Sequence, residues 1–250
     1  MKYAAMAALG LFLLLSATAA QDAAKNGVEQ SEGLEILKKA DAAVKKLKLV
    51  QYSATARALG AEEGRSPTTE GKAVLSGWEN RGPAKYRYEV KVKQPGSDEI
   101  TEYTAGCDGD NTYLIDPAKK IAYVDMDPAV LGSAARTVRA ISVGKLVDPD
   151  GFADELKAEK IELKGTTTVD NVECFELHIT YDGRGGEGTY AIAKSDFIPR
   201  RIIRLFQRPD GEKRGREVVL TNVKINPNVD KDPFALAVPE GFTKTDDFAP

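Results

Sequence analysis

The alternation of apolar and charged side chains over residues 85–93 constrains the fold more than any other feature. The positions between the apolar residues carry Lys, Arg or Glu, and the apolar residues themselves are Tyr86, Tyr88, Val90 and Val92. A period of two places these two sets on opposite faces of a β-strand. One face is then buried and the other solvated, which is typical of a strand in an antiparallel sheet.

The same period recurs along most of the chain. Runs typical of strands cover residues 49–59, 69–78, 85–94, 99–106, 110–116, 119–125, 160–168, 171–182, 187–194, 197–207 and 214–225. Turn sequences such as Pro209-Asp210-Gly211 separate several of them. About eleven mostly consecutive strands joined by short links predict a mainly β fold with some α, built on one strongly curved antiparallel sheet or half-open barrel.

Two segments have a helical period instead. Ser31 can cap an N-terminal helix whose apolar residues recur every three or four positions, at Leu34, Leu37, Ala40, Val44 and Leu47. From Asp127 to about Lys157 a helical insertion between strands 6 and 7 carries a second apolar stripe, at Leu131, Ala135, Val138 and Ile141. A further short helical stretch includes Phe152 and Leu156. Both segments are expected to bury their stripes against the concave face of the sheet.

The N-terminus has the pattern of a secretory signal peptide. Lys2 precedes an apolar run over residues 4–15, and the small residues that follow end at Gln21. The run is too short for a comfortable transmembrane helix, and no later segment is long and apolar enough. We therefore expect a signal peptide at 1–20, cleaved after Ala19 or Ala20, a flexible lead-in at 21–30 and a single domain at 31–250 that is exported as a monomer.

Composition and motifs leave few candidates for catalysis. The formal charge of −3 argues against a nucleic-acid partner. Residues 107–111 are acidic, but a hairpin turn explains them better than a cation loop, since further acidic ligands are missing. No glycine loop for phosphate is present. His178 is the one histidine, so a secreted hydrolase would depend on it as general base. The sequence thus predicts no catalytic residue, no metal site and no cofactor.

Cys107 and Cys174 are the two cysteines of the chain. In an oxidising compartment they are candidates for one disulfide, and the alternative is two buried thiols that never meet.

The apolar face of the sheet is the remaining candidate for function. Its inward residues are predicted by alternation to be Tyr86, Tyr88, Val90, Val92, Phe175, Leu177, Ile179, Tyr190 and Ile192. A sheet of this length offers concave surface that can hold a hydrophobic ligand or an acyl chain. The alternative is a closed core packed against the helices.

A series of short motifs resembles the LolA-like superfamily of outer-membrane lipoprotein carriers. They follow the superfamily's order over nearly the whole mature chain: Leu37-Lys38-Lys39-Ala40-Asp41 before Tyr52-Ser53-Ala54-Thr55; Asp108-Gly109 with Tyr113, Asp116-Pro117 and Lys120; Val169 to Leu177; Phe197-Ile198-Pro199-Arg200-Arg201; Asn222 to Pro227; Phe234-Ala235-Leu236; and Val238-Pro239-Glu240-Gly241-Phe242. The order helix, six strands, helical insertion and five strands is also similar to that of the superfamily.

The resemblance implies a periplasmic protein that holds acyl chains of lipids or lipoproteins in an apolar cavity without a cofactor. It also implies an Arg that locks the helical lid, for which Arg57, Arg87 and Arg200 are all candidates. The superfamily includes envelope sensors that bind partner proteins. A carrier is therefore the first hypothesis, and a protein-interaction module with a filled cavity is the second.

Overall fold

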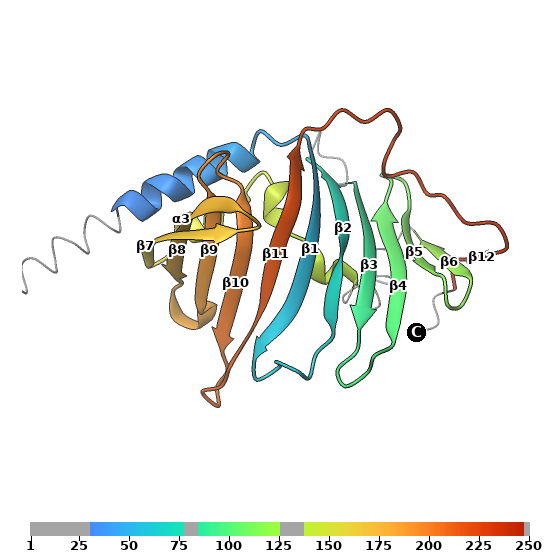
Figure 1. The fold of residues 1–250 in the computed structure, drawn as a ribbon, viewed down its shortest axis with the longest axis horizontal. Coiled ribbons are helices and arrows are strands. Elements are labelled where there is room, and N and C mark those ends of the chain that lie inside the picture. The colour runs from blue at the N-terminus through green and yellow to red at the C-terminus, as the bar shows by residue number, and fades with distance from the viewer. Residues whose placement is uncertain (1–30, 78–84, 126–137, 248–250) are drawn as a thin grey trace, which may run out of the picture.

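The computed structural model of the chain describes residues 31–77, 85–125 and 138–247. Twelve strands form one curved, unclosed sheet in the order β12-β6-β5-β4-β3-β2-β1-β11-β10-β9-β8-β7 (Figure 1). The strands are β1 Leu49–Gly60, β2 Thr68–Ser76, β3 Tyr86–Lys93, β4 Ile100–Cys107, β5 Thr112–Asp116, β6 Ile121–Asp125, β7 Lys160–Val169, β8 Val172–Thr180, β9 Glu187–Ala193, β10 Pro199–Gln207, β11 Lys213–Ile225 and β12 Thr243–Thr245. This architecture is the half-open barrel expected from the sequence.

The eleven predicted strands are all present, with ends that differ from the prediction by a few residues. They pair antiparallel throughout, as the alternation requires. β12 was not predicted, because its three residues are too few to establish a period. It pairs parallel with β6 through Thr243 and Ile121 and forms one edge of the sheet.

The two halves of the sheet meet at its centre, where β1 pairs with β11. The register runs from Val50 opposite Ile225 to Gly60 opposite Arg214. β1 through β6 lie on one side of this junction and β7 through β11 on the other (Figure 1). The inner face is therefore built from both ends of the chain.

The N-terminal helix covers the inner face on the side of β7, as predicted from its apolar stripe. Its described part spans residues 31–44, and Leu37, Ala40 and Val44 are buried in the main core. The helix lies so close to β7 that a Cβ on Gly33 would stand 3.0 Å from the backbone nitrogen of Leu163. A side chain at position 33 would therefore push the helix away from the sheet.

The described part of the insertion covers the same face with shorter elements than expected. It contains two 3₁₀ turns, η1 Arg139–Ile141 and η2 Gly144–Leu146, followed by α3 Ala153–Leu156. Val138 and Ile141 are buried, as predicted, whereas Leu131 lies outside the described residues. Glycines and a proline between 144 and 151 prevent one continuous helix. We call residues 138–156 the cover.

The C-terminal segment packs on the outer face of β5 and β6. Leu236, Val238 and Phe242 contact a second, smaller apolar cluster there, formed by Tyr113, Ile115, Ala122 and Val124. The Tyr113 hydroxyl donates a hydrogen bond to the Phe234 carbonyl at 3.2 Å. The C-terminal motif of the sequence is therefore a structural element of the sheet edge.

The disulfide interpretation is corrected by the structure, in which Cys107 and Cys174 are both free and buried. Cys107 ends β4 and Cys174 lies on β8, with β3, β2, β1, β11, β10 and β9 between them. Neighbouring strands lie about 4.8 Å apart, whereas a disulfide requires Cα atoms within about 7 Å. Sequence spacing carried no information about this distance.

The predicted signal peptide and lead-in, residues 1–30, lie outside the described part of the chain. Among the described residues, no helix has both the length and the apolar character needed to cross a membrane.

Candidate ligand-binding site

The nine residues predicted to face a cavity all belong to the inner face. Seven are buried in the main core, and Tyr86 and Phe175 are half-buried against it. Leu177, Ile179, Tyr190 and Ile192 have no exposed surface. The helix and the cover pack on this face, so the nine residues are core residues in this structure. Their contact with a ligand stays a prediction that requires the cover to move.

A buried carboxylate fastens the cover to the sheet. Glu155 of α3 has no exposed surface, and its Oε1 accepts hydrogen bonds from the hydroxyls of Tyr181 at 2.6 Å and Tyr190 at 2.8 Å. Arg204 Nη1 on β10 donates to the same oxygen at 3.1 Å. Lys145 Nζ donates to Oε2 at 2.7 Å. We call these five residues the Glu155 cluster.

The charges of the Glu155 cluster compensate one another. Burial alone would raise the pKa of Glu155, but the hydrogen bonds and the positive charge of Lys145, together with the two tyrosine hydroxyls, outweigh it and hold the pKa below its ordinary value. Burial also raises the pKa of Tyr181 and Tyr190, which therefore stay neutral donors. The Arg204 guanidinium stacks 3.7 Å from the centre of the Tyr181 ring.

Two further tyrosines hold the cover beside this cluster. The Tyr52 hydroxyl donates to the Ile141 carbonyl and accepts from the Val143 amide, both at 3.1 Å. The Tyr88 hydroxyl donates to Ser142 Oγ at 2.7 Å, and burial raises its pKa to about 12. The cover is thus attached by polar contacts at both of its ends.

None of the three arginines proposed as a lid lock contacts the cover through an ion pair. Arg57 pairs with Glu217 at 2.6 Å, Arg87 with Glu89 at 3.0 Å, and Arg200 with Asp196. Arg204 of β10 does form an ion pair with the cover, through Glu155 at 3.1 Å. The sequence contained a sign that Glu155, the partner of Arg204, is buried. Glu155 follows the apolar Phe152 by three residues, so the two side chains share one face of a helix.

A cavity of about 630 Å³ opens at the other end of the inner face. Small side chains form its floor, Ala56 and Ala58 on β1, and Ala140 of η1 lies over them. Phe206 of β10, which is 40% exposed, lines its side. We call this space the inner cavity. It exists because alanines leave room where larger residues fill the rest of the face.

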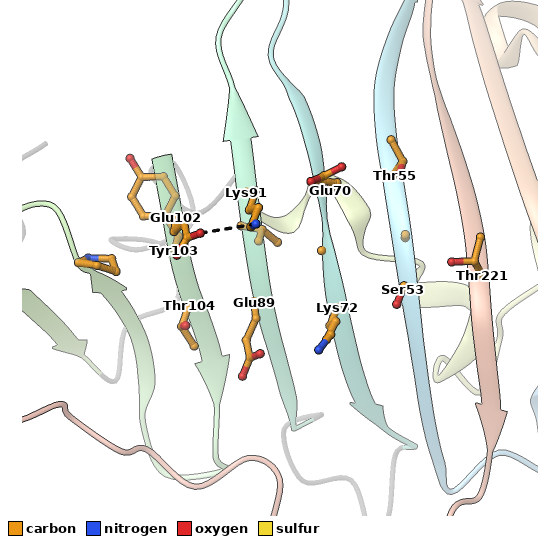
Figure 2. A pocket seen from close by; sticks show the side chains of 14 residues that line it. Ser53, Thr55, Glu70, Lys72, Glu89, Lys91, Glu102, Tyr103, Thr104 and Thr221 are labelled. Carbon is orange, nitrogen blue, oxygen red and sulfur yellow. Dashed lines mark ion pairs between the residues drawn. The ribbon is translucent and has the colours of Figure 1, made fainter. Parts of the chain in front are cut away.

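A second hollow, of about 520 Å³, lies on the outer face of β1–β4 (Figure 2). Charged side chains of opposite sign face each other across its strands, as in the ion pair of Lys91 with Glu102 at 3.8 Å. Glu70 and Glu89 flank Lys91 and Lys72 in the same way. Cross-strand pairs of this kind stabilise a solvated sheet face. Val90, Tyr103 and Pro117 also line this hollow, but the charged pairs run across its strands and no element of the cover lies over it.

The other residues that the sequence offered for catalysis or metal binding have contacts that stabilise the fold. His178 of β8 is half-buried, with its Nε2 3.6 Å from the carboxylate of Glu187 on the next strand. Asp108 accepts hydrogen bonds from the backbone of Asp110 and Asn111, which is the predicted turn. Within the described ranges, no group of three or more His, Cys, Asp or Glu is arranged to hold a metal ion.

Comparisons with known proteins place the chain among solved structures of low sequence identity. No family model and no curated protein matches the sequence. LprF from Mycobacterium bovis is 15% identical over 82% of this chain and 98% of its own, with a TM-score of 0.47. The lipoprotein LppX from Mycobacterium tuberculosis is 12% identical over 80% and 99%, also at 0.47. MucB from Pseudomonas aeruginosa, solved with MucA, is 9% identical over 82% and 61%, at 0.48.

At these sequence identities the comparisons concern the fold and give no function for this chain. The functional proposal therefore rests on the residues of the chain itself.

Proposed function

We propose that this protein is a non-enzymatic carrier that binds the acyl chains of lipids or lipoproteins on the inner face of its sheet. The inner cavity is the observation that carries the proposal. It lies between small apolar side chains, Ala56 and Ala58, and a cover attached to the sheet by a limited set of polar contacts. Its volume is in the usual range for ligand sites, roughly 300–1,000 Å³.

The energetics of burial support such a ligand. Each methylene group removed from water contributes about 0.8 kcal/mol, so a chain of a dozen carbons contributes roughly 10 kcal/mol before ordering costs. The contacts of the cover oppose its displacement: three hydrogen bonds of Tyr52 and Tyr88 at about 1 kcal/mol each, and four contacts of the charged Glu155 at about 1.5–3 kcal/mol each. These contributions are similar in size to that of the acyl chain, so we expect the chain to fill the inner cavity first and to reach Leu177 and Tyr190 only when the cover opens.

The proposed compartment is the periplasm. Residues 1–20 have the charge, length and cleavage pattern of a signal peptide. In that compartment a lipid needs a protein to cross the aqueous space, and the chain needs no cofactor for passive burial. Release then follows when the cover opens or when a membrane or protein acceptor takes the chain.

The test uses two matched tryptophan variants of β1. Ala58→Trp fills the inner cavity, whereas Thr55→Trp adds the same side chain to the outer face of the same strand. We expect wild type and Thr55→Trp to bind a fluorescent fatty acid and to retain lipid in native mass spectrometry, and Ala58→Trp to lose both. A folded Ala58→Trp protein that binds as wild type does would place the ligand elsewhere and contradict the proposal.

The packed main core favours one alternative, a protein-interaction module on the same fold. Its buried residues leave the inner face filled apart from the inner cavity. This alternative predicts that wild type binds no fatty acid and carries no lipid from the periplasm. Crosslinking in the envelope would then identify a protein partner.

A further inference from the structure

The inner cavity is apolar on one side and positively charged on the other. Arg214 and Arg216 of β11 line it opposite Ala140. Arg216 precedes Val218 and Leu220, which are buried in the main core, by two and four residues, so it belongs to the inner face by alternation. In the register of β10 and β11, Arg216 stands opposite Arg204 and Arg214 stands opposite Phe206. Three guanidinium groups therefore converge on one end of the inner face.

Within the part of the chain that the structure describes, one of these three groups is paired with a carboxylate. Arg204 is paired with Glu155 at 3.1 Å. Over residues 31–77, 85–125 and 138–247, the side chains of Arg214 and Arg216 have no ion pair and no hydrogen bond. Like charges on directly opposed positions of neighbouring strands destabilise a sheet unless a counter-charge is present.

The charged residues that line the cavity are mostly basic. Glu62 is the one acidic residue among the described lining, and the hydrogen bond that it accepts from Ser66 Oγ at 3.3 Å leaves its carboxylate charged. Arg57 also lines the cavity and is paired with Glu217 and Glu63. Arg214 and Arg216 outnumber Glu62, so the described lining has a net positive charge.

Arg214 and Arg216 are both exposed, so a ligand at the rim of the cavity can reach their guanidinium groups. Arginine stays charged in such surroundings. A guanidinium fork matches a phosphate or carboxylate in two parallel hydrogen bonds.

We infer that Arg214 and Arg216 bind the anionic headgroup of an amphiphile, a phosphate or a carboxylate, whose acyl chain enters the inner cavity along Ala56, Ala58 and Phe206. The inference rests on the proposed function and narrows its substrate class to anionic lipids. It also assigns the orientation of the ligand: the headgroup lies beside Arg214 and Arg216, and the acyl chain extends from there toward the cover.

Three probes and one pair of variants test this inference by calorimetric titration below the micelle concentration. The probes are dodecyl phosphate, 1-dodecanol and inorganic phosphate. Arg214→Gln/Arg216→Gln removes the charge, and Arg208→Gln is the control, because Arg208 lies on the same hairpin and is paired with Asp210 at 3.5 Å. Far-UV circular dichroism verifies that all variants are folded.

We expect wild type and Arg208→Gln to bind dodecyl phosphate about tenfold or more tightly than dodecanol, as one or two charge-assisted hydrogen bonds imply. The double variant loses this preference and keeps its affinity for dodecanol. Equal binding of both amphiphiles by wild type, or an unchanged preference in the double variant, overturns the inference and leaves acyl binding intact. Inorganic phosphate that binds as tightly as dodecyl phosphate also overturns it, because the site would then serve a free anion. If neither amphiphile binds, the proposed function itself fails.

Discussion

Glu155→Gln is the substitution that most directly tests how the cover is held. The change keeps the size of the side chain and one carbonyl oxygen, so the hydroxyls of Tyr181 and Tyr190 retain an acceptor. It removes the negative charge that neutralises Lys145 and Arg204. The new amide group also directs a donor toward one of its cationic neighbours, which have only donors.

The size of the effect follows from burial. Glu155 has no exposed surface, and Lys145 and Arg204 have side-chain exposures of 27% and 25%. Removing one partner of a buried ion pair costs about 3–5 kcal/mol, because the remaining charge stays desolvated. We expect the lower end of that range, since solvent partly reaches both cations. About 3 kcal/mol corresponds to a rise of about 100-fold in the population of the open cover.

Hydrogen exchange shows whether the destabilisation caused by Glu155→Gln is confined to the cover. Amides of residues 144–156 should exchange about 100-fold faster in Glu155→Gln, while amides of the β1–β11 pair keep their protection. Glu187→Gln is the matched control: Glu187 also contacts two basic side chains, but it is 30% exposed, and surface pairs contribute only about 0–1 kcal/mol. The reasoning is refuted if the two variants exchange at the same rate in the cover.

Three other predictions concern pH, the C-terminal motif and the thiols. Because the pKa of Glu155 is lower in the folded state, its contribution to stability is complete above the ordinary value of 4.5 and is lost as the pH falls through the folded pKa. Protection of the cover amides, measured relative to their intrinsic exchange rates, should be independent of this group above pH 4.5 and decrease below it. Asn226 Oδ1 accepts hydrogen bonds from the backbone amides of Lys48 and Leu49 at 2.7 and 3.1 Å. Asn226→Ala should therefore lower the free energy of unfolding in urea by about 1–2 kcal/mol, whereas the control Asn228→Ala should leave it unchanged. Alkylation of denatured, unreduced protein should add a label to both Cys107 and Cys174, and native protein should add neither; unlabelled denatured protein would restore the disulfide interpretation.

The strands were predictable because their constraint is local. In β3 the side chains alternate between the two faces of the sheet, so the position of a residue in the strand decides whether it is buried. Tyr88, Val90 and Val92 are all buried, as expected. β12 lacked such a pattern, and its existence depends on the edge of β6, which is far away in the sequence. The same reason explains the cysteines, whose separation depends on the order of strands across the sheet.

The site was only partly predictable. Alternation identified the inner face, but it did not distinguish the packed part of that face from the inner cavity, since this depends on where the cover lies. Arg204 and Arg216 lie on different strands, and only the register of β10 and β11 places them opposite each other. From residue 139 to 156 the cover consists of two 3₁₀ turns and one short helix where the sequence predicted a helical period, because Gly144 and Gly151 favour turns over a continuous helix.

The pairing of β1 with β11 has a consequence for how the protein is made. β1 is the first strand to emerge during synthesis, yet one of its two neighbours is complete only when Ile225 has been added. Until then its free edge can pair with any other exposed strand, including one from a second nascent chain. A sheet whose central pair joins the first strand to the eleventh also has many contacts between distant residues, and such folds form slowly. The free edge of β1 is therefore exposed to wrong pairing until almost all of the chain has been made.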